Sequence, residues 1–248
     1  MLAGYPISYL HTHNMKLLLL TLLVAGASAG PSYTTVFSEQ NGQGSSLDIS
    51  DYVPDLRVAN FDNVIDSVRQ TGMWIYYDNI NYNIDAGKVY FVHGIDISVN
   101  FPAEYVDMSS SVRFAGSPFH MNEDTWTLYE GKSFTGQEYY GNEDSATLGN
   151  LAGKTFSIVL TGTSPWTVYC GENWVGISLC IYPDTDHDTG ADGSVLDFGI
   201  YPDVTAIHIP EYSIYSIKKG CWSNNVATPP KIQVDGRQEN GAWGHFDL

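Results

Sequence analysis

Hydrophobic and polar residues alternate along several segments of the chain, which is the pattern of half-buried β-strands. The alternation is clearest in KTFSIVLTG, residues 154–162, and in YSIYSIKKG, residues 212–220. Tyr, Trp, Phe, Val, Ile and Thr predominate in the patterned segments, and these residue types favour strands over helices. The pattern therefore predicts an all-β protein.

An aromatic residue followed by glycine seven positions later occurs three times, each time across a short polar turn. The pairs are Phe37 and Gly44, Tyr129 and Gly136, and Tyr169 and Gly176. A fourth copy begins at Tyr77, but it has Ile84 at the glycine position and Gly87 three residues later. Each copy predicts a folded hairpin in which glycine permits a positive φ or a close backbone approach.

Each repeat also contains a later serine followed by a branched apolar residue, at Ser67, Ser111, Ser157 and Ser216. A serine hydroxyl can hydrogen-bond the backbone of the turn and hold the corner in place. The four aromatic residues are 40, 52 and 40 positions apart. Two equal intervals around a longer one indicate two domains of two repeats each, with a boundary near residues 114–124.

The combination of aromatic, glycine and distant serine resembles the βγ-crystallin family, whose Greek-key unit carries these residues at this spacing. The resemblance covers residues 33 to about 221 and is weakest in the second repeat, because of Ile84. It implies two domains, residues 33–115 and 124–221, and a C-terminal tail of residues 222–248. Each domain would be a sandwich of two four-stranded antiparallel sheets built from two Greek keys.

The N-terminal residues 1–29 precede the first repeat and read as an extension plus a signal peptide. Residues 15–29 combine Lys16, a short apolar run and the small residues Ala27-Ser28-Ala29, which together are typical of a cleavable secretory signal. We therefore expect Met15 to be the functional start and the mature protein to be secreted. No other segment of the sequence is long and apolar enough to predict a membrane span.

Members of the βγ-crystallin family that bind calcium carry a loop, [N/D]-[N/D]-x-x-[S/T]-S, that ends on the corner serine. The first repeat reads Asp62-Asn63-Val64-Ile65-Asp66-Ser67 and matches this loop except that Asp66 replaces Ser or Thr. A carboxylate still offers oxygen, which calcium prefers. We expect Asp62, Asn63, Val64 and Asp66 to bind calcium together with Asp78 from the neighbouring hairpin; a metal-free turn rich in Asx residues is the alternative.

The second repeat keeps part of the loop, with Asp107 and Ser110, and its neighbouring hairpin carries Ser38. These three residues form the second expected calcium site. The loop of the third repeat contains Lys154 and no acid, and that of the fourth keeps only Glu211. We expect neither of these two loops to bind calcium.

The formal net charge of −17 argues against a nucleic-acid partner, because phosphate binding requires a positive face. Ten residues of the fourth repeat, DTDHDTGADG at positions 184–193, only partly match a calcium-binding EF-hand loop. A solvated acidic loop is the expected form, with a nonstandard calcium site as the alternative. The three cysteines, Cys170, Cys180 and Cys221, allow one disulfide; a bridge involving Cys221 is expected, but its partner is left open.

The sequence lacks the metalloprotease, nucleophile-elbow and phosphate-loop motifs of common enzymes, and a filled β-sandwich offers little cleft. The expected function is therefore that of a secreted, non-enzymatic, calcium-binding structural protein. The alternative is an interaction subunit or inhibitor-type partner of another secreted protein, such as a pore-forming complex. The acidic insertion, the odd cysteine and the C-terminal tail are the candidate surfaces for that partner, and an enzyme is the third hypothesis.

Overall fold

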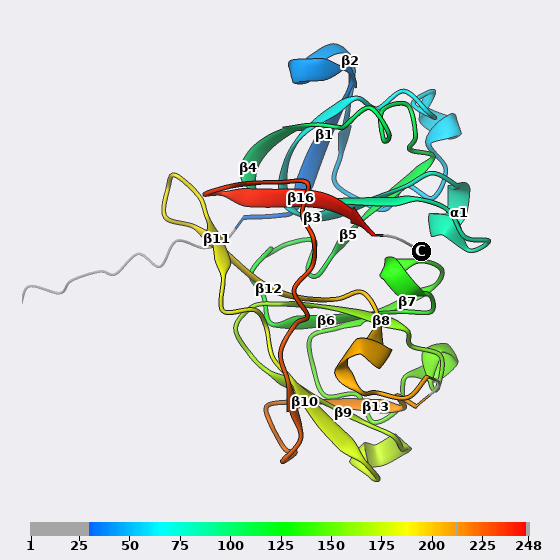
Figure 1. Cartoon of the computed structure of the whole chain (residues 1–248), viewed down its shortest axis with the longest axis vertical. Helices are drawn as coiled ribbons and strands as arrows, with labels where there is room; N and C mark the ends of the chain where they lie inside the picture. The colour runs from blue at the N-terminus through cyan, green and yellow to red at the C-terminus, as the bar shows by residue number, and fades with distance from the viewer. Residues whose placement is uncertain (1–29, 212, 247–248) are drawn as a thin grey trace, which may run out of the picture.

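The computed structural model describes residues 30–211 and 213–246, so the signal peptide expected at residues 15–29 lies outside the described residues. These described residues are almost entirely β, as predicted, with one short helix, α1 (Ile80–Asn83) (Figure 1). Six turns of 3-10 helix are η1 (Gln40–Gly42), η2 (Leu56–Ala59), η3 (Lys132–Phe134), η4 (Gly149–Leu151), η5 (Glu172–Trp174) and η6 (Val204–Ile207).

The first half of the molecule, residues 33–115, contains β1 (Tyr33–Glu39), β2 (Gln43–Ile49), β3 (Ser67–Tyr77), β4 (Val89–Asn100) and β5 (Ser111–Ala115). The two long strands β3 and β4 pass through both layers of a sandwich. The start of β3 pairs with β1, and its end pairs with β5. The register shifts between Gln70 and Gly72, and the left-handed φ of 97° at Gly72 marks the bend between the layers.

The second half, residues 125–219, has the same arrangement of layers but builds it from shorter strands, each of which belongs to one layer. They are β6 (Thr125–Tyr129), β7 (Glu138–Gly141), β8 (Ser157–Thr161), β9 (Trp166–Tyr169), β10 (Ser178–Ile181), β11 (His187–Thr189), β12 (Val195–Tyr201) and β13 (Ser216–Lys219). One layer has the order β11-β12-β8-β6-β7, and the other contains β13-β9-β10. In each half an apolar core lies between the two layers, around Trp74 in the first and Trp166 in the second. The Greek-key sandwich prediction is confirmed, but the layer that begins with β11 has five strands rather than the expected four, because the insertion adds β11 to its edge.

A third apolar cluster joins the two halves. It combines Met73, Ile75 and Tyr77 of β3 with Val159 of β8 and Ile200 of β12, all of them buried. The outward-facing residues of one layer in each half therefore do not face solvent but pack against the other half.

The C-terminal tail extends both halves. Its first strand, β14 (Val226–Ala227), pairs in parallel with β10, and its last strand, β16 (Gly241–Phe246), pairs antiparallel with β4. The strand β15 (Gly236–Gln238) pairs with the outer side of β16. In Figure 1 the tail runs in orange and red from the β10 end of the molecule to β4. Because β4 and β10 are equivalent strands, the tail covers the same sheet edge in both halves.

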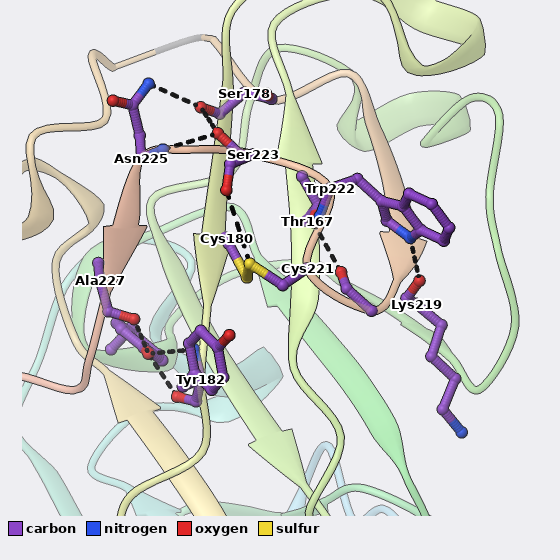
Figure 2. The surroundings of a disulfide bond; sticks show 12 residues. Thr167, Ser178, Cys180, Tyr182, Lys219, Cys221, Trp222, Ser223, Asn225 and Ala227 are labelled. Atoms are coloured by element: carbon purple, nitrogen blue, oxygen red, sulfur yellow. Dashed lines mark hydrogen bonds between the residues drawn. A yellow bond between two sulfur atoms is a disulfide. The ribbon is translucent and has the colours of Figure 1, made fainter.

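The tail begins at a disulfide between Cys180 on β10 and Cys221, which leaves Cys170 as the free cysteine. Figure 2 shows the hydrogen bonds that hold the segment after the bridge. The Ser223 hydroxyl donates to the Ser178 carbonyl at 2.8 Å, and the Trp222 N–H donates to the Thr167 hydroxyl at 2.9 Å. The expectation that Cys221 is bridged is confirmed, and its partner is Cys180.

Candidate metal-binding loops

The four predicted serines form the same pair of hydrogen bonds in all four repeats. Each hydroxyl donates at 2.6 Å to the carbonyl two residues after the aromatic residue, and accepts at 2.9–3.1 Å from the N–H five residues after it. The serine, carbonyl and N–H residues are Ser67, Glu39 and Gly42; Ser111, Asn79 and Tyr82; Ser157, Gly131 and Phe134; and Ser216, Gly171 and Trp174. The predicted corner is therefore confirmed in every repeat.

The glycine at the seventh position is left-handed in the three repeats that have it. Gly44 has a φ of 79°, and a Cβ there would lie 2.5 Å from the Ser38 hydroxyl oxygen. The second repeat, which has Ile84 there, makes a longer turn that ends at Gly87. In that turn the Asn83 side chain accepts from the Asn79 N–H at 2.9 Å and donates to the Lys88 carbonyl at 2.8 Å. These bonds compensate for the missing glycine.

The two loops expected to bind calcium in the first half lie against each other. The Asn63 N–H donates to the Ser109 carbonyl at 2.9 Å, and the Asp107 N–H donates to the Ile65 carbonyl at 3.2 Å. Asn63 and Asp107, which occupy the same position in their loops, both have left-handed φ, of 54° and 52°. The fold thus brings the acidic residues of both repeats to one end of the sandwich.

The grouping of the expected ligands differs from the prediction. The Asp66 N–H donates to the Phe37 carbonyl at 2.9 Å, which places Asp66 beside Ser38 rather than Asp78. The Ser110 N–H donates to the Tyr77 carbonyl at 2.7 Å, which places Ser110 beside Asp78 rather than Ser38. The hairpin that contributes to each site is therefore the opposite of the expected one. The corner serine bonds the hairpin of its own repeat, and the fifth loop residue comes directly before that serine. The fifth loop residue therefore lies beside the hairpin of its own repeat, not beside that of the neighbouring repeat.

Asp66 is surrounded by other acids. Burial raises the pKa of its carboxyl, and the negative charges of Asp107 and Glu39 raise it further. In the other group, the Ser110 hydroxyl lies 3.4 Å from the Asn63 amide oxygen, and the Asn63 amide nitrogen lies 3.4 Å from an Asp62 carboxylate oxygen. Val64, which precedes buried Ile65, could contribute only its backbone carbonyl to a metal ion.

Two carboxylate oxygens in these loops, Oδ1 of Asp62 and Oδ1 of Asp66, are buried and have no hydrogen-bond partner within the described part of the chain. Burying an oxygen anion without a partner is unfavourable, so each needs a compensating donor or cation. Among residues 30–211 and 213–246, no three His, Cys, Asp or Glu side chains converge to hold a metal. A cation bound here would therefore also need backbone carbonyl, amide and hydroxyl oxygens.

The corresponding region of the second half carries a lysine. The Lys132 ammonium, on the hairpin of the third repeat, lies 2.8 Å from Asp203 and 4.0 Å from Glu211. The ammonium of Lys132 thus lies beside the acids of the fourth repeat. Lys154, in the loop of the third repeat, is exposed. Tyr212, which belongs to the fourth loop, lies outside the described residues.

A buried charged network connects the two halves, and it was not predicted. The guanidinium of Arg113, which is 1% exposed, donates to the Phe134 carbonyl at 2.6 Å and lies 3.4 Å from Glu138. Its charge also faces the ring of Tyr129, 4.7 Å from its centroid. Burial raises the pKa of the Glu138 carboxyl, and Arg113 opposes this rise. An arginine inside a strand gives no sequence signal of this role.

The acidic insertion forms a second unpredicted contact between the halves. Asp184 and Asp186 are exposed, as expected of a solvated loop, but Asp188 is buried. A carboxylate oxygen of Asp188 lies 2.6 Å from Nδ1 of His93 on β4, and the ring of His93 packs 4.2 Å from that of Phe198. The expectation of a solvated loop is therefore wrong at Asp188, because the partner comes from the other half.

No family model and no curated protein matches the sequence. Among solved structures, the chain is similar to Geodin, a βγ-crystallin from Geodia cydonium, with 19% identity and a TM-score of 0.58 over 76% of this chain and 99% of Geodin. An archaeal βγ-crystallin has 25% identity and a TM-score of 0.32 over 40% of this chain and 99% of its own. Protein S in complex with calcium has 18% identity and a TM-score of 0.29 over 75% and 98%.

The likeness to Geodin shows that the chain has a βγ-crystallin-like fold. No helix in the described residues is both long and apolar enough to cross a membrane.

Proposed function

We propose that this protein is secreted, has no catalytic activity, and binds calcium through the paired loops of its first half as a structural protein of the extracellular space. Secretion rests on the signal-like sequence of residues 15–29. The role of calcium would be to neutralise the acidic loops and to stabilise the fold, since the folded loops bind the ion and the unfolded chain does not.

The observation that carries the proposal is the pair of buried, unpartnered oxygens on Asp62 and Asp66. Calcium prefers carboxylate, carbonyl and hydroxyl oxygens, and both loops supply these groups. One ion would be held by Asp66 with Asp107 and Ser38. The other would be held by Asp62, Asn63 and the Val64 carbonyl, with Ser110 and Asp78.

Calorimetric titration of the purified protein with calcium tests this assignment. We expect a binding heat that is lost at one site in Asp66→Ala. Asp66→Ser, which restores the hydroxyl typical of the family, should retain binding at reduced affinity, because it keeps an oxygen but removes a charge. Glu143→Ala, at an exposed acid of the second half, is the matched control and should bind as the unmodified protein does. An unchanged heat in Asp66→Ala would refute the site at Asp66.

A second function, as an interaction subunit of another secreted protein, is supported by the far end of the second half. Five large apolar side chains are at least one-third exposed there, on the η5 hairpin and the start of the tail: Trp174, Val175, Ile177, Trp222 and Val226. Exposed apolar side chains gathered in one region are typical of docking surfaces. If this surface is used, co-purification of the protein from its native source should yield a partner. The variant Trp222→Ser should then fail to bind that partner, while the control Val58→Ser, in the first half, should still bind it.

A further inference from the structure

A cavity of about 630 Å³ lies at one end of the core of the second half. Its floor contains Val168 of β9 and Leu179 of β10, which face each other directly across the two strands. Ile207 and Ile214 form the wall on the side of η6, and Val226 of β14 forms the wall on the side of the tail. The cavity is thus lined by three separate segments of the chain and is partly open to solvent.

The corresponding space in the first half is filled by aromatic rings. Val168 and Leu179 are equivalent to Tyr76 and Tyr90, because both pairs face each other across their strands, one residue before the hairpin aromatic Tyr169 or Tyr77. Tyr76 and Tyr90 are fully buried. Their ring centroids lie 5.1 Å and 4.6 Å from that of Phe101, and that of Tyr90 lies 4.8 Å from that of Tyr105.

Two aliphatic side chains therefore replace two phenol rings in an otherwise equivalent position. Protein interiors are normally close-packed, and voids larger than a water molecule are few. The first half shows that this fold can fill the space with its own side chains. In the second half the space is open, and its volume lies in the range of small-molecule binding sites, about 300–1,000 Å³.

The lining of the cavity contains no Asp, Glu, Lys or Arg, although the protein carries a net charge of −17. Its polar side chains include His208, Ser213, Asn224 and Asn225, beside the apolar floor. Such a lining suits an uncharged ligand with an apolar body and a hydrogen-bonding end, since a buried charge would have no partner.

The wall contributed by the tail is held firmly. Val226 pairs with Cys180 in the parallel β10–β14 ladder, and the disulfide from Cys180 anchors the tail five residues earlier, at Cys221. The Asn225 side chain donates to the Ser178 carbonyl at 3.3 Å (Figure 2). A wall that is held in place in this way loses little entropy when a ligand enters.

We infer that the second half contains a binding site for a small, uncharged, mainly apolar ligand, seated over Val168 and Leu179 between η6 and the tail. The site is separate from the acidic loops of the first half and does not depend on calcium.

Fluorescence titration of the full-length protein with the neutral dye N-phenyl-1-naphthylamine tests the site. We expect saturable binding of one dye per chain. The double variant Val168→Tyr/Leu179→Tyr, which rebuilds the aromatic filling of the first half, should weaken binding at least tenfold. The control Val58→Tyr adds a ring at a residue that is 80% exposed in the first half, and it should bind the dye as the unmodified protein does. Should the double variant misfold, Leu179→Tyr alone replaces it, because Leu179 is only half-buried.

The free thiol of Cys170, which lines the cavity, reports where the dye binds. Saturating dye should slow alkylation of Cys170 by N-ethylmaleimide several-fold, and the slowing should disappear in the filled variant. The inference is overturned if the dye does not bind, if the filled variant binds it equally well, or if bound dye leaves the alkylation rate unchanged. The last two outcomes would assign the dye to the exposed apolar residues around Trp174 and Trp222.

Discussion

The two halves of the molecule have the same corner geometry but different chemistry. All four corner serines make the same two hydrogen bonds, whether the adjoining loop contains Asp66 or Lys154. The first half gathers acids with unpartnered oxygens at its loops and fills its core end with tyrosines. The second half has a lysine among its acids and an open cavity at its core end.

This difference shows that the backbone scaffold and the side chains of the loops and core ends vary independently within one chain. The scaffold depends on a few residues that form each turn and on the serine that closes it. The loop acids and the residues of the core end lie outside that set, so they can change without altering the corner. The two halves therefore provide internal controls for each other.

The largest expected effect comes from breaking the charged network that couples the halves. Arg113→Met removes the cation and leaves Glu138 buried beside Tyr52 without its partner. Removing one member of a buried pair typically lowers the free energy of unfolding by about 3–5 kcal/mol. We expect a loss of this size in denaturant titration, together with separation of the unfolding of the two halves.

The control for this variant is Arg69→Met, because Arg69 is paired with Asp96 on the surface, with both side chains more than half exposed. Exposed pairs contribute little to stability. If Arg113→Met and Arg69→Met unfold at the same denaturant concentration, the network does not couple the halves, and the apolar cluster between them must do so instead.

A smaller and equal effect is expected from the corner serines. Ser67→Ala and Ser157→Ala each leave a turn carbonyl and a turn N–H without their hydroxyl partner. Leaving such groups unsatisfied costs about 1–3 kcal/mol. We expect the two losses to agree within error in calcium-free buffer, with Ser98→Ala, on an exposed strand position, as the neutral control. A loss in only one half would contradict the equivalence of the corners.

The corners could be predicted from the sequence because the residues that form each turn are close together along the chain. The aromatic residue, the turn and the glycine are within eight residues, and the spacing repeats, so the signal does not depend on tertiary packing. The βγ-crystallin-like fold followed from that signal. Even the irregular second repeat was located by Tyr77 and Gly87, although its lengthened turn closed by Asn83 was not foreseen.

The features that were missed depend on contacts between distant segments. Asp188 and His93 are 95 residues apart, and only the packing of the two halves brings them together. The exchange of Ser38 and Asp78 between the expected calcium sites likewise depends on how the hairpins cross. The sequence reveals the cavity only when Val168 and Leu179 are compared with their equivalents in the first half. That comparison requires the strand register, which the sequence alone does not give.

The smallest expected effect on stability comes from the charge of Asp66. The equivalent loop position in the second half is occupied by the apolar residue Phe156. Because the pKa of Asp66 is raised in the folded protein by burial, Asp107 and Glu39, the folded state holds this proton more tightly than the unfolded chain. Stability without calcium must therefore fall as the pH rises from the ordinary carboxyl pKa of 3.8 through the raised value.

Asp66→Asn removes this charge, so in the presence of a chelator it should stabilise the protein slightly at pH 7 and by less near pH 4. With saturating calcium the sign should reverse at pH 7, because the variant loses an anionic ligand and with it part of the stabilisation by bound ion. Denaturant midpoints measured with and without calcium at both pH values check this reversal, with Glu143→Gln as the control. If Asp66→Asn has the same effect with and without calcium, the acidity of the first half does not serve cation binding, and the contrast between the halves needs another explanation.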